Sequence, residues 1–199
     1  MKKLWTDLHS NIHHNQMDEL DKWTEHAKDV LDFWPIAYYP FQMIKTESGA
    51  GLEDLCPEEE IKKDWEIVRR KVKEENANGY PMFMGYEWQG CGFDGDHNVF
   101  FLDNEQDMKH PMRYQELRDD YKDTEAIGIP HHVAYQLGSR GKNWATHDEN
   151  FSPFAEIYSS HGCSENDTGG MDMERHLHMG PRTGETCYER GLEAGLHVG

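Results

Sequence analysis

The chain has 199 residues and a formal net charge of −18, because 38 acidic side chains oppose 20 basic ones. This charge opposes binding to nucleic acids or anionic membranes, which depends on lysine and arginine neutralising phosphates. No apolar run is long enough to cross a bilayer, and none follows the basic start Met1-Lys2-Lys3, so we expect neither a membrane span nor a signal peptide. The four cysteines form no C-x-x-C pair, which excludes a zinc ribbon and favours free thiols in a cytoplasmic protein.

The predicted strands and helices alternate along the chain. The predicted strands are 4–8, 32–40, 81–88, 97–102, 126–132 and 154–159, with an unfinished one at 196–199. The predicted helices are 17–31, 57 to a stop at 78–79, 111–121 and 186–194. Residues 42–56 are predicted to be a lid or binding loop.

This alternation is typical of βαβ units with a mainly parallel sheet, and the length fits one domain. A closed (β/α) barrel usually needs about 250 residues. The sequence therefore predicts an α/β fold of the distorted barrel type over residues 1–199, which is either incomplete or completed by a partner.

A carboxylate and an imidazole lie two positions apart at the end of the first predicted strand. If residues 4–8 are extended, Asp7 and His9 point the same way, and His14 follows shortly after them. Imidazole suits zinc, iron or manganese, and a nearby carboxylate can bind the ion or orient its ligand. We interpret this stretch as part of a metal site, although a solvated histidine-rich loop explains it equally well when it is taken alone.

Similar residues recur at other predicted strand ends. Glu87 ends one strand, and a carboxylate that points into a barrel is costly unless it is paired or bound to metal. His131 and His132 end another strand, where alternation favours His132, but Pro130 weakens the count. Since sites in such barrels lie at the carboxyl ends of strands, we expect these side chains to converge on a metal centre. A salt-bridged glutamate is the alternative for Glu87.

Three further candidates carry competing interpretations. Glu156 faces inward by alternation, and it is either a ligand or a residue that orients one; His161 is either a ligand or a surface histidine. His97 precedes its strand, so it reaches the site only if residues 97–102 run antiparallel to the other strands or if residues 90–96 fold back.

Two basic residues follow the paired histidines. Arg140 and Lys142 are candidate anchors for an anionic substrate group in an otherwise acidic chain. An ordinary solvated loop is the alternative interpretation.

Taken together, these segments resemble the PHP (polymerase and histidinol phosphatase) superfamily, and more closely an uncharacterised branch of PHP-like metal-dependent hydrolases. The segments that carry the resemblance are Thr6-Asp7-Leu8-His9, Gly85-Tyr86-Glu87-Trp88, Asp96-His97-Asn98-Val99-Phe100-Phe101, Ile129-Pro130-His131-His132, and Glu156-Ile157-Tyr158 with Ser164-Glu165. The resemblance implies a distorted barrel with up to three divalent ions held by histidine and acidic residues. It also implies hydrolysis, commonly of phosphoesters, and makes His97 a ligand.

The chain departs from the family pattern at three places. The first motif of the family is usually His-x-His. Here Asn11 stands two residues after His9, in place of the second histidine, which leaves His13 or His14 as a substitute. The second strand of the family usually ends in an acidic residue followed by histidine, but here that place holds Tyr38-Tyr39. The late Asp-x-His motif is missing because the chain stops at Gly199, so we expect a truncated domain with fewer ions.

The function that we expect is metal-dependent hydrolysis, most commonly of a phosphoester, with water activated by zinc, manganese or iron. Asp7 would orient a ligand or accept a proton, and Arg140 or Lys142 would hold an anionic small molecule. One alternative is a non-catalytic ligand-binding module with a partial metal site, which the Tyr38-Tyr39 replacement suggests. Another is amide or lactone hydrolysis on the same scaffold. We expect no nucleic-acid or membrane partner, and the sequence leaves a homo-oligomer open.

Overall fold

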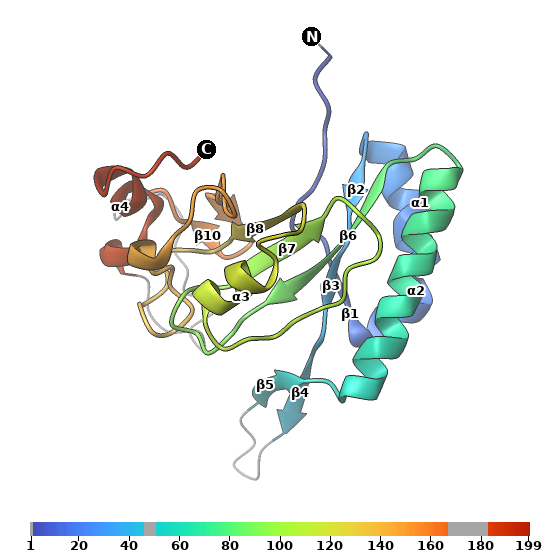
Figure 1. Cartoon of the computed structure of the whole chain (residues 1–199), viewed down its shortest axis with the longest axis horizontal. Coiled ribbons are helices and arrows are strands. Elements are labelled where there is room, and N and C mark those ends of the chain that lie inside the picture. The colour runs from blue at the N-terminus through green and yellow to red at the C-terminus, as the bar shows by residue number, and fades with distance from the viewer. Residues whose placement is uncertain (1, 46–50, 167–182) are drawn as a thin grey trace. The chain divides into compact units, whose positions relative to one another are not determined.

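The computed structural model describes residues 2–45, 51–166 and 183–199, and it has a mixed α/β fold (Figure 1). The chain divides into two compact units. The first comprises the residues up to Glu87 together with Phe100–Met108, and the second comprises Trp88–Val99 and Lys109–Gly199. No helix within the described residues combines the length and the apolar character that crossing a membrane requires. None of the four cysteines, all of which are described, forms a disulfide.

The first unit is built on short parallel strands. β1 (Asn11–His13) pairs with β3 (Ala37–Tyr39), and β3 pairs with β6 (Met82–Trp88), both in parallel. β2 (Trp34–Pro35) also pairs with β6 in parallel. The strand that was predicted over 32–40 is thus present, although Ile36 separates it into two pieces.

Two helices cover this part of the sheet (Figure 1). The helix η1 (His14–Glu19) leads into α1 (Leu20–Val30), and α2 is Glu58–Ala77, so the predicted helices are confirmed. Ion pairs join α1 to α2, with Lys28 Nζ 2.6 Å from Glu75 Oε2. The three glutamates in the first turn of α2 favour a helix start there, because their charge complements the helix dipole.

The buried face of α2 carries the aromatic core of this unit. Ile61, Trp65, Val68 and Val72 recur at helical spacing and are all buried. The Trp65 ring centroid lies 6.3 Å from that of Phe101 at an interplanar angle of 80°, which is the edge-to-face arrangement that aromatic pairs prefer. The apolar stripe read from the sequence therefore anchors the helix to the sheet.

A two-stranded ribbon replaces the loop that was predicted over 42–56. β4 (Phe41–Lys45) and β5 (Gly51–Leu55) pair antiparallel from Phe41 opposite Leu55 to Lys45 opposite Gly51. The loop prediction is wrong for these residues, and 46–50 lie outside the described part. The glycines and acidic residues in this stretch concealed the strands, because composition is a weak signal for a ribbon that backbone pairing holds together.

Within the described residues, the second unit contains four short strands and four short helices. The strands are the first residues of β7 (His97–Phe101), β8 (Ala126–Pro130), β9 (Tyr158–Ser159) and β10 (Gly162–Cys163). The helices are α3 (Tyr114–Asp120), η2 (Trp144–Thr146), η4 (Gly184–Thr186) and α4 (Tyr188–Glu193). The helices predicted at 111–121 and 186–194 are therefore present, both shorter than predicted.

The direction of β7 decides where the residues before it lie. The strand order is β1-β3-β6-β7-β8, and only residues 89–96 connect β6 to β7. Neighbouring parallel strands need a crossover of about a dozen residues or more, so β7 runs antiparallel to β6. His131 N donates to Asp96 O at 3.2 Å, which places the end of β8 beside the start of β7. Together with β2, these five strands thus form an open, mixed sheet rather than a closed barrel, and β4–β5 and β9–β10 form two smaller sheets.

Three predicted strands are wrong or reduced. Residues 4–8 form no strand, because Asp7 Oδ1 accepts a hydrogen bond from His9 N at 2.8 Å and closes a local turn. Only Tyr158–Ser159 remains of the strand predicted over 154–159. Residues 196–199 form no strand either, although Gly199 N donates to Pro153 O at 3.0 Å.

Candidate metal centre

One carboxylate and two imidazoles meet inside the second unit. Asp96 immediately precedes β7, while His131 and His132 immediately follow β8. Because these two strands run antiparallel, the start of one and the end of the other lie at the same edge. All three side chains are buried, and each offers one ligand atom within 4.8 Å of the others.

An unusual backbone conformation lets two consecutive histidines serve one site. Successive side chains on a strand point to opposite faces. His132 has a φ of 36°, in the left-handed region that residues with a Cβ rarely adopt, so the alternation ends there. The rings of His131 and His132 lie 4.4 Å apart at an interplanar angle of 83°. The structure thus brings both His131 and His132, between which alternation had left the choice open, into the same group.

The spacing of these donors fits a single divalent ion. His132 Nε2 lies 3.6 Å from Asp96 Oδ2. Two ligands on one tetrahedral zinc ion, each at about 2.1 Å, are separated by about 3.4 Å. Two imidazoles and one carboxylate that leave further positions open are typical of catalytic zinc sites and of non-haem iron sites.

Other predicted residues surround this group. Arg140 Nη1 lies 2.7 Å from Asp96 Oδ2, and Glu156 Oε1 accepts a hydrogen bond from His132 N at 3.4 Å. The His161 ring is 4.6 Å from that of His132, and its Nδ1 is 2.9 Å from Tyr135 Oη. Glu156 and His161 therefore contact a histidine of the group, the first through the backbone and the second through its ring.

His97 and Lys142 contact each other beside this group. His97 Nδ1 lies 3.0 Å from the Gly95 carbonyl oxygen, so this nitrogen carries the proton and Nε2 is the acceptor. Lys142 Nζ lies 3.1 Å from that Nε2 and 3.9 Å from the centroid of the Tyr114 ring. Burial lowers the pKa of His97 well below its usual value and lowers that of Lys142 to about 7. In this arrangement Lys142 occupies the nitrogen with which His97 would bind a metal.

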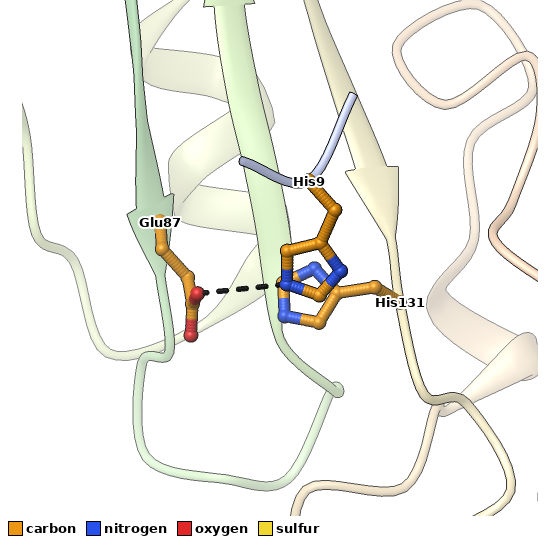
Figure 2. A group of neighbouring side chains, drawn as sticks. All are labelled: His9, Glu87 and His131. Carbon is orange, nitrogen blue, oxygen red and sulfur yellow. Dashed lines mark ion pairs between the residues drawn. The ribbon is translucent and has the colours of Figure 1, made fainter. Parts of the chain in front are cut away.

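In the first unit, His9 and Glu87 form an ion pair, drawn as a dashed line in Figure 2. His9 Nε2 lies 3.9 Å from Glu87 Oε2, and Asn11 Nδ2 donates to the same oxygen at 2.7 Å. Glu87 is buried at the end of β6, as its position in the sequence predicts. Asn11 therefore supports the carboxylate of Glu87 with a hydrogen bond.

His14 and Asp7 have other partners in this unit. His14 Nδ1 lies 2.6 Å from Asp64 Oδ2, and its Nε2 lies 3.1 Å from Glu60 Oε2. Tyr38 Oη donates to the same Asp64 oxygen at 2.8 Å. Asp7 is exposed, and one of its oxygens accepts from the backbone of His9, so it is not on a shared strand face with that residue.

Sequence reasoning did not assign Asp96 as a ligand. Its segment carries part of the family resemblance, but only His97 was singled out within it. The signal that could have found it is the short 89–96 connection, which forces β7 to run antiparallel and brings the residue before it to the carboxyl ends of neighbouring strands.

The comparisons with known proteins give no family for this chain. No model of a protein family matches it, and a search of curated proteins finds no match either.

Proposed function

We propose that this protein is a metal-dependent hydrolase whose ion is held by Asp96, His131 and His132. The observation that carries the proposal is the meeting of these three buried side chains, with donor atoms within 4.8 Å of one another. The resemblance of the strand-end segments to the PHP superfamily supports the same reaction. A bound divalent ion would lower the pKa of a coordinated water and polarise the bond to be hydrolysed.

The chain's own residues would supply position and charge. Glu156 would hold the backbone of His132, and the His161 ring would pack against the His132 ring. Both contacts hold the imidazole at a fixed orientation, as partners of metal ligands commonly do. Arg140 places a cationic guanidinium beside the group, which favours an anionic substrate such as a phosphoester.

The proposal is tested by metal content and turnover of the same preparations. Elemental analysis and zinc or manganese titration should show stoichiometric binding, and the loaded protein should hydrolyse p-nitrophenyl phosphate or bis-p-nitrophenyl phosphate. Asp96→Asn and His131→Ala should lose both properties, while His26→Ala, which removes an exposed histidine of α1, should lose neither. A wild-type protein that is folded by circular dichroism and binds no ion on titration would end the proposal. Nitroanilides and lactones in the same screen separate phosphoester from amide or lactone hydrolysis.

A non-catalytic binding module is the second candidate, and the environment of two tyrosines favours it. Tyr38 and Tyr39 stand where the family usually has metal-binding residues. Tyr38 Oη donates to Asp64 and Tyr39 Oη donates to Glu53 at 2.6 Å, so both are built into local networks. Stoichiometric metal binding without turnover on any ester of the screen would favour this candidate.

A further inference from the structure

One oxygen of Asp96 faces both the Arg140 guanidinium and the position that a metal ion would take. Its Oδ2 lies 3.6 Å from His132 Nε2, the spacing that one ion between them would need, and 2.7 Å from Arg140 Nη1. Asp96 itself has no exposed surface. A buried carboxylate needs a compensating charge, and either the guanidinium or a metal ion can provide it.

Backbone hydrogen bonds hold Arg140 at this position. Arg140 has a φ of 68°, and its N–H donates to Gly92 O at 3.0 Å. The next residue is pinned as well, because Gly141 N donates to Gln136 O at 3.1 Å. A Cβ on Gly141 would lie 2.0 Å from Tyr135 O, so this approach requires glycine. The backbone of Arg140 is therefore held in place, and its side chain, which is 22% exposed, extends inward to the Asp96 carboxylate.

We propose that Arg140 weakens metal binding at the Asp96–His131–His132 centre by competing for Asp96 Oδ2. This inference rests on the proposed metal centre. The guanidinium stays protonated at all working pH values, so it cannot leave by losing its charge. An ion that binds Asp96 through Oδ2, the oxygen that faces His132, must therefore share that oxygen with a fixed positive charge or displace it, and either outcome costs affinity.

The opposite role is physically reasonable and predicts the opposite result. Hydrogen-bond partners of ligating carboxylates often orient them, and removing such a partner typically lowers metal affinity by about 10- to 100-fold. Competition predicts that removing Arg140 raises the affinity. The sign of the change therefore separates the two roles.

Zinc affinity, measured by competition with a chromogenic chelator, tests the inference. Arg140→Met keeps a long, unbranched side chain and removes its charge. The variant should bind zinc at least about tenfold more tightly than wild type. Arg140→Lys keeps the charge and should stay near wild type. Arg190→Met removes an arginine that pairs with Glu189 and Glu193, and thus controls for the change in net charge.

Thermal unfolding of the same variants gives a second readout that a merely structural role would not reproduce. Without zinc, Arg140→Met should melt below wild type, because Asp96 loses its counterion; with saturating zinc, its melting temperature should rise by more than that of wild type. An unchanged or weaker zinc affinity in Arg140→Met, with wild-type binding that Asp96→Asn abolishes, would overturn the competition and leave the metal centre intact. Zinc binding by Arg140→Met alone would support the inference, and binding by neither protein would overturn both proposals.

Discussion

Lys142 Nζ donates a hydrogen bond to His97 Nε2 across 3.1 Å inside the second unit, where neither side chain has more than 1% exposure. Lysine is almost never buried without a carboxylate partner. The backbone fixes this pair from both sides, since Gly95 O holds His97 Nδ1 and Lys142 N donates to Val133 O at 3.0 Å. Because the two side chains are held in contact away from water, the protonation state of Lys142 affects the free energy of unfolding.

Stability should rise with pH above neutrality because of Lys142. Burial lowers the pKa of this lysine to about 7, whereas a lysine in the unfolded chain titrates near 10.4. Between these values the unfolded chain binds the additional proton, so the free energy of unfolding increases with pH. The gain should be on the order of a few kcal/mol between pH 7 and pH 10. Urea unfolding across this range measures it.

Lys142→Met should flatten that rise and stabilise the protein at pH 7, because no charged group is then buried beside His97. Lys63→Met, which replaces an exposed lysine of α2, is the matched control and should leave the slope unchanged. A slope in Lys142→Met as steep as that of wild type would contradict this account.

Asp94 should make the protein sensitive to acid. Burial alone would raise its pKa, but hydrogen bonds from Arg113 and from Tyr114 N lower it, with Arg113 Nε at 2.8 Å and Tyr114 N at 3.1 Å. A carboxyl group whose pKa is depressed by folding contributes stability above about pH 4, which is lost as the pH falls through the folded-state pKa. Asp94→Asn should cost about 2 kcal/mol at pH 6, since Arg113 remains partly solvated.

The same variant should lose less stability than wild type between pH 5 and pH 3. Asp123→Asn, at an exposed position after α3, should behave as wild type at every pH. Equal acid sensitivity of Asp94→Asn and wild type would show that other carboxyl groups dominate.

Local patterns predicted the elements that bury a regular face. The apolar spacing of α2 and the strand around Glu87 follow directly from the sequence, because a buried stripe needs periodic apolar residues. The ribbon of β4 and β5 and the turn at Asp7 are held by backbone and polar contacts, which leave no such period. The predictions were wrong at both of these places.

The candidate site was predicted in part for a related reason. His131 and His132 were visible at a strand end, and Glu87 was visible at another. Asp96 depends on the direction of β7, and the pairing of Lys142 with His97 depends on residues 45 positions apart. The sequence alone does not report which of two neighbouring polar side chains turns toward a partner that distant.

Gly141 should tolerate no side chain. A Cβ there would meet Tyr135 O at 2.0 Å and Gln136 C at 2.7 Å, and both are backbone atoms that cannot rotate away. Gly141→Ala should destabilise the protein by about 3 kcal/mol or more and displace Arg140 and Lys142 on either side. Gly195→Ala is the control, because its φ of 84° costs about 1 to 2 kcal/mol while nothing lies within 4 Å of the added carbon. Equal melting temperatures of the two variants would count against the close approach.

Tyr38→Phe should weaken the first unit through Asp64. Burial raises the pKa of the Tyr38 hydroxyl well above its usual value, so the group stays protonated and donates to Asp64 Oδ2. Without the hydroxyl, Asp64 Oδ2 keeps its contact with His14 Nδ1 at 2.6 Å but loses one hydrogen bond. The free energy of unfolding should fall by about 1 kcal/mol, the usual net value of one hydrogen bond. Tyr39→Phe removes a hydrogen bond to the exposed Glu53, whose oxygen water can satisfy, so it should cost less. Chemical unfolding of both variants checks the order, and a larger loss in Tyr39→Phe would contradict the role assigned to Asp64.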